Sequence, residues 1–192
     1  NDITDVELAI GVDTAVNVAL DAVDKIRDTA TSLERIFVVE VMGRKSGYIA
    51  LQVALAGGCE EVLLPEKTSD VERMCREIQH ANAKGKASFI VIVAEGAAKA
   101  ADIAALITRQ TGFETRVTVL GHIQRGGQPT AVDRILASQL GSHAVEVLLA
   151  GGSDVCVHRN DHTCGTIPLS RAVQPKKIKV METYRLIKLL TK

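Results

Sequence analysis

Short apolar runs alternate with amphipathic segments along most of the chain. The runs lie at 36–41 (IFVVEV), 61–64 (EVLL), 88–93 (SFIVIV) and 115–120 (TRVTVL). Apolar runs of this length are typical of strands that are buried on both faces of a parallel sheet. We therefore expect four strands over these ranges.

The segments between these runs show the apolar spacing of helices. We predict helices over 15–27, 48–56, 69–83, 97–110 and 131–149, and a helical pattern near the end of the basic segment 176–192. Ser69 or Asp70 would cap the third helix, and Gly151-Gly152 would stop the fifth. One more short strand is expected over 155–158. The alternation predicts an α/β fold, with a mostly parallel sheet covered by helices on both faces.

Composition narrows the class of protein. The chain has 192 residues, of which 46% are hydrophobic and 3% aromatic, so aliphatic side chains must fill the core. This length suits one domain or one lobe of a larger protein. A formal charge of +0 argues against bulk electrostatic binding to nucleic acid or membranes. No apolar run reaches the roughly 18 residues that a membrane span needs.

The cysteines indicate the cellular compartment, and the first residues indicate whether the chain is part of a longer protein. Four widely spaced cysteines indicate reduced thiols in a cytoplasmic protein. The first five residues, NDITD, carry neither an initiator Met nor a signal-peptide pattern. We therefore expect the chain to begin within a longer protein.

A cluster of cysteine and histidine allows two interpretations. Cys156, His158, His162 and Cys164 lie within nine residues and could bind zinc. The histidine spacing fits a structural zinc site, whereas the cysteine spacing does not. A strand followed by a polar loop is the favoured interpretation, and we predict no metal site.

Polar residues beside glycines follow three of the predicted strands. Met42-Gly43-Arg44 follows the first strand, Glu95-Gly96 follows the third, and 121–127 (GHIQRGG) follows the fourth. In open α/β sheets, ligands bind beyond the carboxyl ends of the strands, and glycine lets the backbone approach a ligand closely. Three strand ends of this kind predict one binding site.

The side chains at these ends suit a phosphorylated sugar. Arg44 and Arg125 present planar guanidinium groups that match phosphate oxygens. Glu95 can accept hydrogen bonds from sugar hydroxyls, and His122 can donate or accept. Each of these side chains alone could be an ordinary surface residue, but together they favour a sugar-phosphate site.

A second charged set lies at the amino ends of the same strands. It comprises Arg27, Arg35, Glu60, Lys84, Lys86 and Arg116. Arg35 and Arg44 are nine residues apart along a mostly extended segment, a span of more than about 20 Å at roughly 3.3 Å per residue. One small ligand cannot contact both within a single chain. The second set is therefore surface charge, a second site or a subunit interface.

Two motifs show a resemblance to a known family. The run 116–134 (RVTVLGHIQRGGQPTAVDR), together with Met42-Gly43-Arg44, resembles the signature of bacterial-type ATP-dependent 6-phosphofructokinases. The similarity covers roughly residues 1–160. It implies a phosphofructokinase-like fold with Rossmann-like layers. It also implies a cytoplasmic glycolytic homotetramer that transfers the γ-phosphate of MgATP to the 1-hydroxyl of fructose 6-phosphate, giving fructose 1,6-bisphosphate.

The resemblance assigns roles residue by residue. The substrate-binding residues would be Met42, Gly43, Arg44, Glu95, His122, Ile123, Gln124 and Arg125, with Arg35 and Arg116 reaching the site of a neighbouring subunit. An effector site for ADP or phosphoenolpyruvate would comprise Arg27, Gly58, Cys59, Glu60, Lys84, Lys86, Ala87 and Ser88. Asp2 and Arg44 are the catalytic candidates. Glu34, beside Arg35, would exchange places with it during allosteric inhibition.

The same resemblance implies that parts of the enzyme lie elsewhere. The family's catalytic base is the first Asp of a Thr-Ile-Asp-Asn-Asp motif, and this chain begins at the Asn of that motif. The sequence also contains no phosphate-binding G-x4-G-K-[ST] loop. We expect Mg²⁺ with ATP to be bound mainly by an N-terminal part outside this chain, so that the chain alone binds sugar phosphate without catalysing transfer. A pyrophosphate-dependent phosphofructokinase and a non-catalytic sugar-phosphate-binding module are the alternatives.

Overall fold

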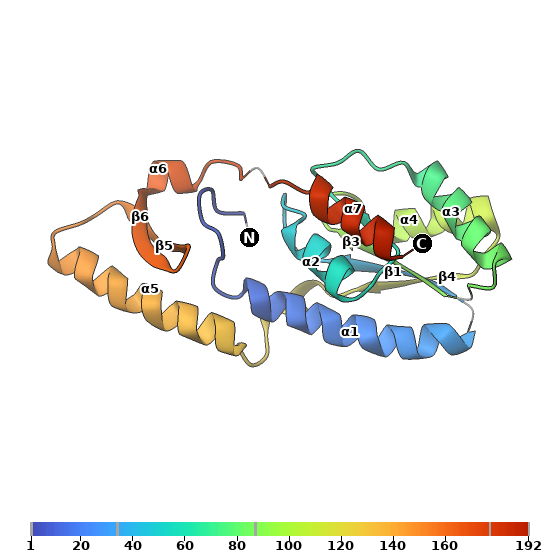
Figure 1. Cartoon of the computed structure of the whole chain (residues 1–192), viewed down its shortest axis with the longest axis horizontal. Helices are drawn as coiled ribbons and strands as arrows, with labels where there is room; N and C mark the ends of the chain where they lie inside the picture. The colour runs from blue at the N-terminus through green and yellow to red at the C-terminus, as the bar shows by residue number, and fades with distance from the viewer. Residues whose placement is uncertain (1, 34, 87, 177, 192) are drawn as a thin grey trace.

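The computed structural model describes residues 2–33, 35–86, 88–176 and 178–191. Its elements in chain order are α1 (Val12–Leu33), β1 (Ile36–Val41), α2 (Tyr48–Ala56), β2 (Glu61–Leu63), α3 (Val71–Ala83), β3 (Phe89–Ala94), α4 (Ala100–Thr111), β4 (Thr115–Val119), the 3-10 helix η1 (Gly121–Arg125), α5 (Ala131–Leu149), β5 (Val155–Asn160), β6 (Thr163–Pro168), α6 (Leu169–Ala172) and α7 (Met181–Leu190). They form a sheet lobe and an arm made of α5, β5, β6 and α6 (Figure 1).

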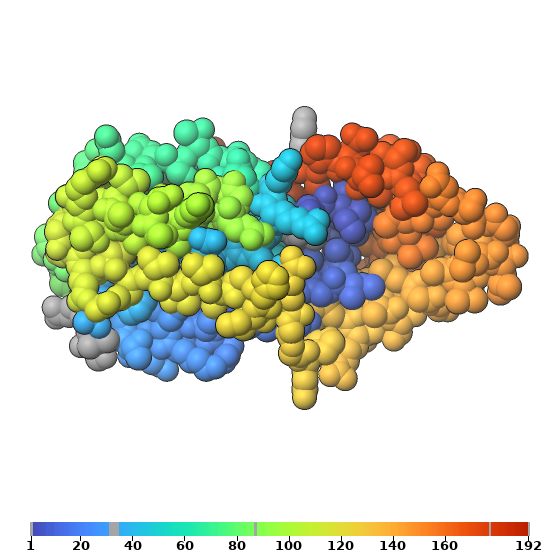
Figure 2. Space-filling view, turned by 180° about the vertical axis from the view of Figure 1, so that it is seen from behind, coloured from blue at the N-terminus to red at the C-terminus, as the bar shows by residue number. Residues whose placement is uncertain are grey.

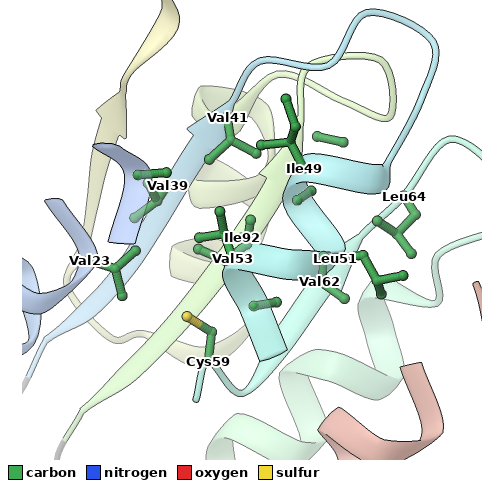
Figure 3. Close-up of a cluster of buried hydrophobic side chains, with 14 of the residues drawn as sticks. Val23, Val39, Val41, Ile49, Leu51, Val53, Cys59, Val62, Leu64 and Ile92 are labelled. Carbon is green, nitrogen blue, oxygen red and sulfur yellow. The ribbon is translucent and has the colours of Figure 1, made fainter. Parts of the chain in front are cut away.

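The sheet lobe is built on four parallel strands in the order β2-β3-β1-β4. Alternate residues of β3 point to opposite faces. Ile90 and Ile92 pack in the cluster formed with α1, α2 and α7, while Val91 and Val93 pack with α3 and α4. Figure 3 shows the first of these clusters, with aliphatic side chains from helix and sheet packed together. The predicted α/β fold with helices on both faces is confirmed.

The starts of two helices are fixed by carboxylates, one local and one distant in sequence. α3 begins at Val71, after Asp70, whose side chain accepts a hydrogen bond from Arg73 N at 2.8 Å. α4 begins at Ala100 rather than at the predicted residue 97. Its first N–H donates to the Glu40 carboxylate in β1 at 2.8 Å. α1 extends beyond the predicted 15–27 at both ends.

The arm differs from the prediction in its strands. The strand expected over 155–158 does form, as part of β5, but it pairs antiparallel with β6 in a separate two-stranded sheet. β6 was not predicted, because the run 163–168 (TCGTIP) is too polar to be recognised as a buried strand. The arm projects beyond the sheet, and the turn between β4 and α5 stands out between the two parts (Figure 2). α5 leaves Leu148 and Leu149 70% and 84% exposed.

Among the described residues, no helix combines the length and the apolar character that crossing a bilayer requires.

Candidate functional site

Three strands end together at the carboxyl edge of the sheet. β1 and β3 pair up to Val41 and Ala94, and β1 and β4 pair up to Glu40 and Val119. The parallel register therefore brings Met42-Gly43-Arg44, Glu95 and η1 to one edge, where the sequence predicted a site.

Glu95 organises the loop that follows β1. Its Oε1 accepts hydrogen bonds from Gly43 N at 2.9 Å and from Arg44 N at 2.6 Å. Its own N–H donates to Val41 O at 3.0 Å. Arg44 has a φ of 52°, in the left-handed region that few non-glycine residues adopt. The two hydrogen bonds from the loop to this carboxylate therefore offset the cost of the unusual backbone conformation at Arg44.

Gly96 permits this close approach of the two loops. A Cβ atom at this position would lie 2.0 Å from Arg44 O. The Glu95-Gly96 pair thus packs directly against the backbone of the Arg44 loop, and a larger residue would separate them.

Gln124 has a positioning role in the structure. It is buried, its Oε1 accepts from Met42 N at 2.8 Å, and its Nε2 donates to Ala15 O at 3.1 Å. Both ends of the amide bind the protein itself. The assignment of Gln124 as a substrate ligand stays a prediction, whereas its link between η1, β1 and α1 is a structural fact.

The remaining candidates present exposed side chains at this edge. Arg44, His122, Ile123 and Arg125 are exposed, and Arg44 Nη1 lies 4.0 Å from Asp2 Oδ2. A hollow of about 490 Å³ adjoins the edge and includes Met42, Gln124 and Arg125 in its lining. The lining of this hollow does not include Glu95 or His122.

Asp133 is a residue that the sequence analysis missed. It is 1% exposed, and its carboxylate accepts from Gly11 N and Thr14 N, each at 2.8 Å, and from the Thr14 hydroxyl. Thr14 Oγ1 in turn accepts from Thr130 N at 3.1 Å. An aspartate in the first turn of a helix is normally explained by its favourable interaction with the dipole of that helix. There was therefore no reason in the sequence to expect that Asp133 of α5 would cap α1. The hydrogen-bonded pair of Thr14 and Asp133 thus joins the start of α1 to the start of α5.

Arg35 and Arg116 lie at the opposite, amino edge of the sheet. Arg35 Nε lies 2.8 Å from Glu114 Oε2, and Arg116 pairs with the same carboxylate. The hydrogen bond from Arg35, followed by the charge of Arg116, lowers the pKa of Glu114 despite the opposing effect of desolvation. The structure therefore brings these two arginines together and separates them from Arg44.

Part of the predicted effector set lines a second pocket at the amino edge. The pocket has a volume of about 580 Å³ and is lined by Glu60, Glu77, His80, Ala81, Lys84, Lys86, Phe89, Lys188 and Thr191. Lys86 Nζ lies 2.9 Å from Glu60 Oε1, and Glu60 Oε2 accepts from Ile90 N at 2.7 Å. Lys188 and Thr191 were missed because they belong to the C-terminal segment, where the family resemblance is weakest.

The other predicted effector residues lie beside this pocket. Arg27 Nη2 donates to Gly57 O and, at 3.2 Å, to Gly58 O. Cys59 is fully buried among aliphatic side chains (Figure 3), and burial raises the pKa of its thiol to about 12 although Arg27 lowers it. Ser88 is half-buried ahead of β3. Ala87 and Glu34 lie outside the described residues.

The Cys/His cluster lies on a two-stranded hairpin rather than on a strand followed by a loop, because Cys164 belongs to β6. In the β5–β6 register, Cys156 is opposite Ile167 and Arg159 is opposite Cys164. The described part of the chain contains no group of three or more His, Cys, Asp or Glu side chains that could hold a metal ion.

The fold is that of an α/β protein with a parallel sheet, and in open sheets of this kind ligands bind beyond the carboxyl ends of the strands. Residues 1–148 match the family model described as Phosphofructokinase. The chain belongs to the phosphofructokinase family.

Its relatives support the same assignment. The chain is 47% identical over 191 residues to an ATP-dependent 6-phosphofructokinase of Bacillus thuringiensis, covering 100% of this chain and 60% of the relative. It is 52% identical over 162 residues to that of Natranaerobius thermophilus, covering 84% and 51%. The phosphofructokinase structure from Saccharomyces cerevisiae aligns with a TM-score of 0.85 at 35% identity, over 90% of this chain and 24% of that one. The chain thus spans 51–60% of the length of these two curated relatives.

Proposed function

We propose that this chain is the fructose 6-phosphate-binding part of an ATP-dependent 6-phosphofructokinase. The observation that carries the proposal is the carboxyl edge, where Glu95 binds the backbone of Gly43 and Arg44 and where the exposed Arg125 follows β4. The relatives at 47% and 52% identity are both named ATP-dependent, which favours ATP over pyrophosphate as the phosphoryl donor.

In this proposal each group at the edge has a separate task. Arg125 binds the 6-phosphate through its guanidinium fork. Glu95 uses Oε1 to hold the loop, and we assign Oε2 to a sugar hydroxyl. His122 donates a hydrogen bond to the sugar. Ile123 and Met42 bound the site, with Gln124 fixing the Met42 backbone through its hydrogen bond.

The chain's contribution to phosphoryl transfer would be orientation and charge. Arg44 carries an exposed guanidinium 4.0 Å from Asp2, so a cation and a carboxylate stand together at the edge. Such a pair can hold the 1-hydroxyl in line and compensate charge that develops during transfer. Mg²⁺ supplies charge neutralisation on ATP when it is bound. We do not assign it to this chain, because the described residues offer no cluster of three ligands for it.

The amino edge would serve other partners. We propose that Arg35 and Arg116 contact the sugar phosphate bound by a neighbouring subunit of a homotetramer, which explains why they lie at the opposite end of the strands from Arg44. We further propose that the second pocket binds ADP or phosphoenolpyruvate through Lys84 and Lys86. The support is the pocket of about 580 Å³ that these lysines line.

The proposal is tested by binding of fructose 6-phosphate to the 192-residue chain, measured by calorimetry. Glu95→Gln keeps one oxygen that can accept from the loop N–H groups. Its second terminal atom becomes an NH₂ group, which cannot accept a hydrogen bond from a sugar hydroxyl. We expect this substitution to weaken binding about tenfold or more. Glu66→Gln is the matched control, because Glu66 also binds this loop, at Gly47 N, with 2.9 Å between Oε1 and N.

Two results would contradict the proposed sugar site. One is the same loss of affinity in both variants, which would mean that loop order alone controls binding. The other is a parent chain that binds inorganic phosphate as tightly as fructose 6-phosphate, which would remove the sugar from the assignment.

A further inference from the structure

The second pocket has one wall that lies outside the residues matched by the family model. That match covers residues 1–148, whereas Lys188 of α7 and the following Thr191 line the pocket. In Figure 1, α7 lies over the sheet lobe at the end of the chain. The contacts of this helix therefore show what the C-terminal segment adds.

Lys188 reaches from α7 to the start of β2 and to α3. Its Nζ donates to Glu60 O at 3.3 Å, to Glu61 Oε2 at 3.2 Å and to Glu77 Oε2 at 2.5 Å. A lysine ammonium has three donors, and these contacts can use all three. Lys188 therefore acts as a positioning residue of the pocket wall.

Glu60 connects that position to the pocket cations. Its backbone oxygen accepts from Lys188, while its carboxylate pairs with Lys86 at 2.9 Å and caps Ile90 N at 2.7 Å. The Glu60 side chain is only 6% exposed, so desolvation strengthens its contacts. A shift of the Glu60 backbone would move Lys86, and the path from α7 to the pocket is a chain of direct contacts.

α7 has other contacts that do not involve the pocket. Ile187 and Tyr184 are buried in the core cluster, and Arg73 Nη2 donates to the Tyr184 hydroxyl at 3.0 Å. Lys67 Nζ stands 4.4 Å from the centre of the Tyr184 ring. These contacts dock the helix independently of Lys188, so its docking and its effect on the pocket can be separated by mutation.

We infer that α7 is a regulatory element of this pocket. Binding of a phosphorylated anion and docking of α7 stabilise each other through Lys188, Glu60 and Lys86. The inference rests on the proposed second site and adds a residue and a helix to it. Coupling of this kind is reciprocal. An anion in the pocket should therefore slow amide exchange in α7, and loss of Lys188 should weaken binding of the anion.

The experiment uses the 192-residue chain with MgADP and, separately, phosphoenolpyruvate as probes. Calorimetry gives the affinity, and hydrogen exchange gives the protection of the α7 amides. In the parent chain we expect ligand to slow exchange across α7. Lys188→Met should weaken binding about fivefold or more and abolish that protection, while Lys188→Arg should restore much of both.

Lys67→Met is the matched control for α7 docking. It removes a lysine that contacts α7 at Tyr184 but does not line the pocket. We expect faster exchange of α7 without ligand. The helix should still be docked in most molecules, because Ile187 and Tyr184 remain buried, so the affinity should stay close to that of the parent.

Three outcomes would decide against the inference in different ways. If Lys188→Met binds with parent affinity, α7 has no part in the pocket, and the second site itself stands. If Lys67→Met weakens binding as much as Lys188→Met, the helix acts through docking alone and Lys188 has no specific role. If neither probe binds the parent chain, the proposed second site fails and the coupling fails with it.

Discussion

The two edges of the parallel sheet use their charged side chains in opposite ways. At the carboxyl edge, the carboxylate of Glu95 binds backbone N–H groups, and the side chains of Arg44 and Arg125 are exposed. At the amino edge, carboxylates bind the cations directly, as Glu114 does with Arg35 and Arg116.

This difference separates two ways of binding an anion. At the carboxyl edge the backbone is already held in place before a ligand binds, so the free-energy cost of ordering the loop on binding is small. A ligand at the amino edge must replace existing ion pairs, and its binding is an exchange of partners. Affinity at the carboxyl edge should therefore depend on loop order, and affinity at the amino edge on the carboxylates that compete with the ligand.

The largest effect is expected where the carboxyl edge is anchored. Asp133→Ala removes a buried carboxylate that binds Gly11 N, Thr14 N and the Thr14 hydroxyl. We expect the free energy of unfolding to fall by about 3 kcal/mol, measured by urea denaturation. Asp133→Asn keeps an acceptor and should lose less. Equal losses in both variants would show that the negative charge, rather than the acceptor, stabilises the start of α1.

A smaller effect is expected at Gln124. Gln124→Leu leaves the Met42 N–H and the Ala15 carbonyl without the amide that now binds them. Each lost partner is costly for a buried group, so we expect a loss of about 2 kcal/mol. Gln110→Leu on the exposed end of α4 is the control and should change stability little. A chain that tolerates Gln124→Leu without loss would mean that loop order does not depend on this bridge.

The amino edge should respond in affinity rather than in stability. Glu114→Gln removes the charge that Arg35 and Arg116 share. The melting temperature should hardly change, since exposed ion pairs contribute little. Binding of tripolyphosphate to the chain, followed by calorimetry at low salt, should become tighter. Unchanged binding would mean that Glu114 does not compete for these arginines.

The pH dependence of this pair has a defined sign. The pKa of Glu114 is lowered in the folded chain, chiefly by Arg35. Its ion pairs are therefore present above the ordinary glutamate pKa and are lost as the pH falls through the lowered value. Below that value, the parent and Glu114→Gln should bind tripolyphosphate equally.

The smallest effect concerns Cys59. Burial raises the pKa of its thiol to about 12, so at pH 8 it should react with iodoacetamide far more slowly than the half-buried Cys156 and Cys164. Peptide mapping by mass spectrometry measures the three rates. Because an unfolded thiol ionises near 9, stability from this group should fall as the pH rises from about 9 towards 12. Rapid alkylation of Cys59 in the folded chain would exclude the buried, protonated thiol.

The sequence predicted the parallel sheet well because its signal is local. Each central strand is a short apolar run, so burial on both faces is visible in β1 and β3 directly. Arg44, Glu95, His122 and Arg125 were predicted from their positions directly after the predicted strands, since parallel strands end at the same edge.

What the sequence did not reveal depends on contacts between distant segments. Asp133 binds residues 119 and 122 positions away, and Lys188 binds glutamates more than 100 positions away. The exchange predicted for Glu34 and the sugar contacts of His122 remain predictions. The spacing of residues along the chain does not show which side chain will cap a helix that is distant in sequence, as Asp133 caps α1.

The arm adds a mechanical consequence to its anchor. α5 contains 19 residues, and at about 1.5 Å per residue it is a rod of roughly 28 Å. One end is anchored by the hydrogen bonds that Asp133 accepts from Gly11 N and Thr14 N at the start of α1. The far end carries the exposed Leu148 and Leu149. A tilt of about 5° at the anchor would sweep the far end of such a rod through about 2.5 Å. An adjustment of this size in the hydrogen bonds of Asp133 would therefore displace Leu148 and Leu149 by about the diameter of a water molecule.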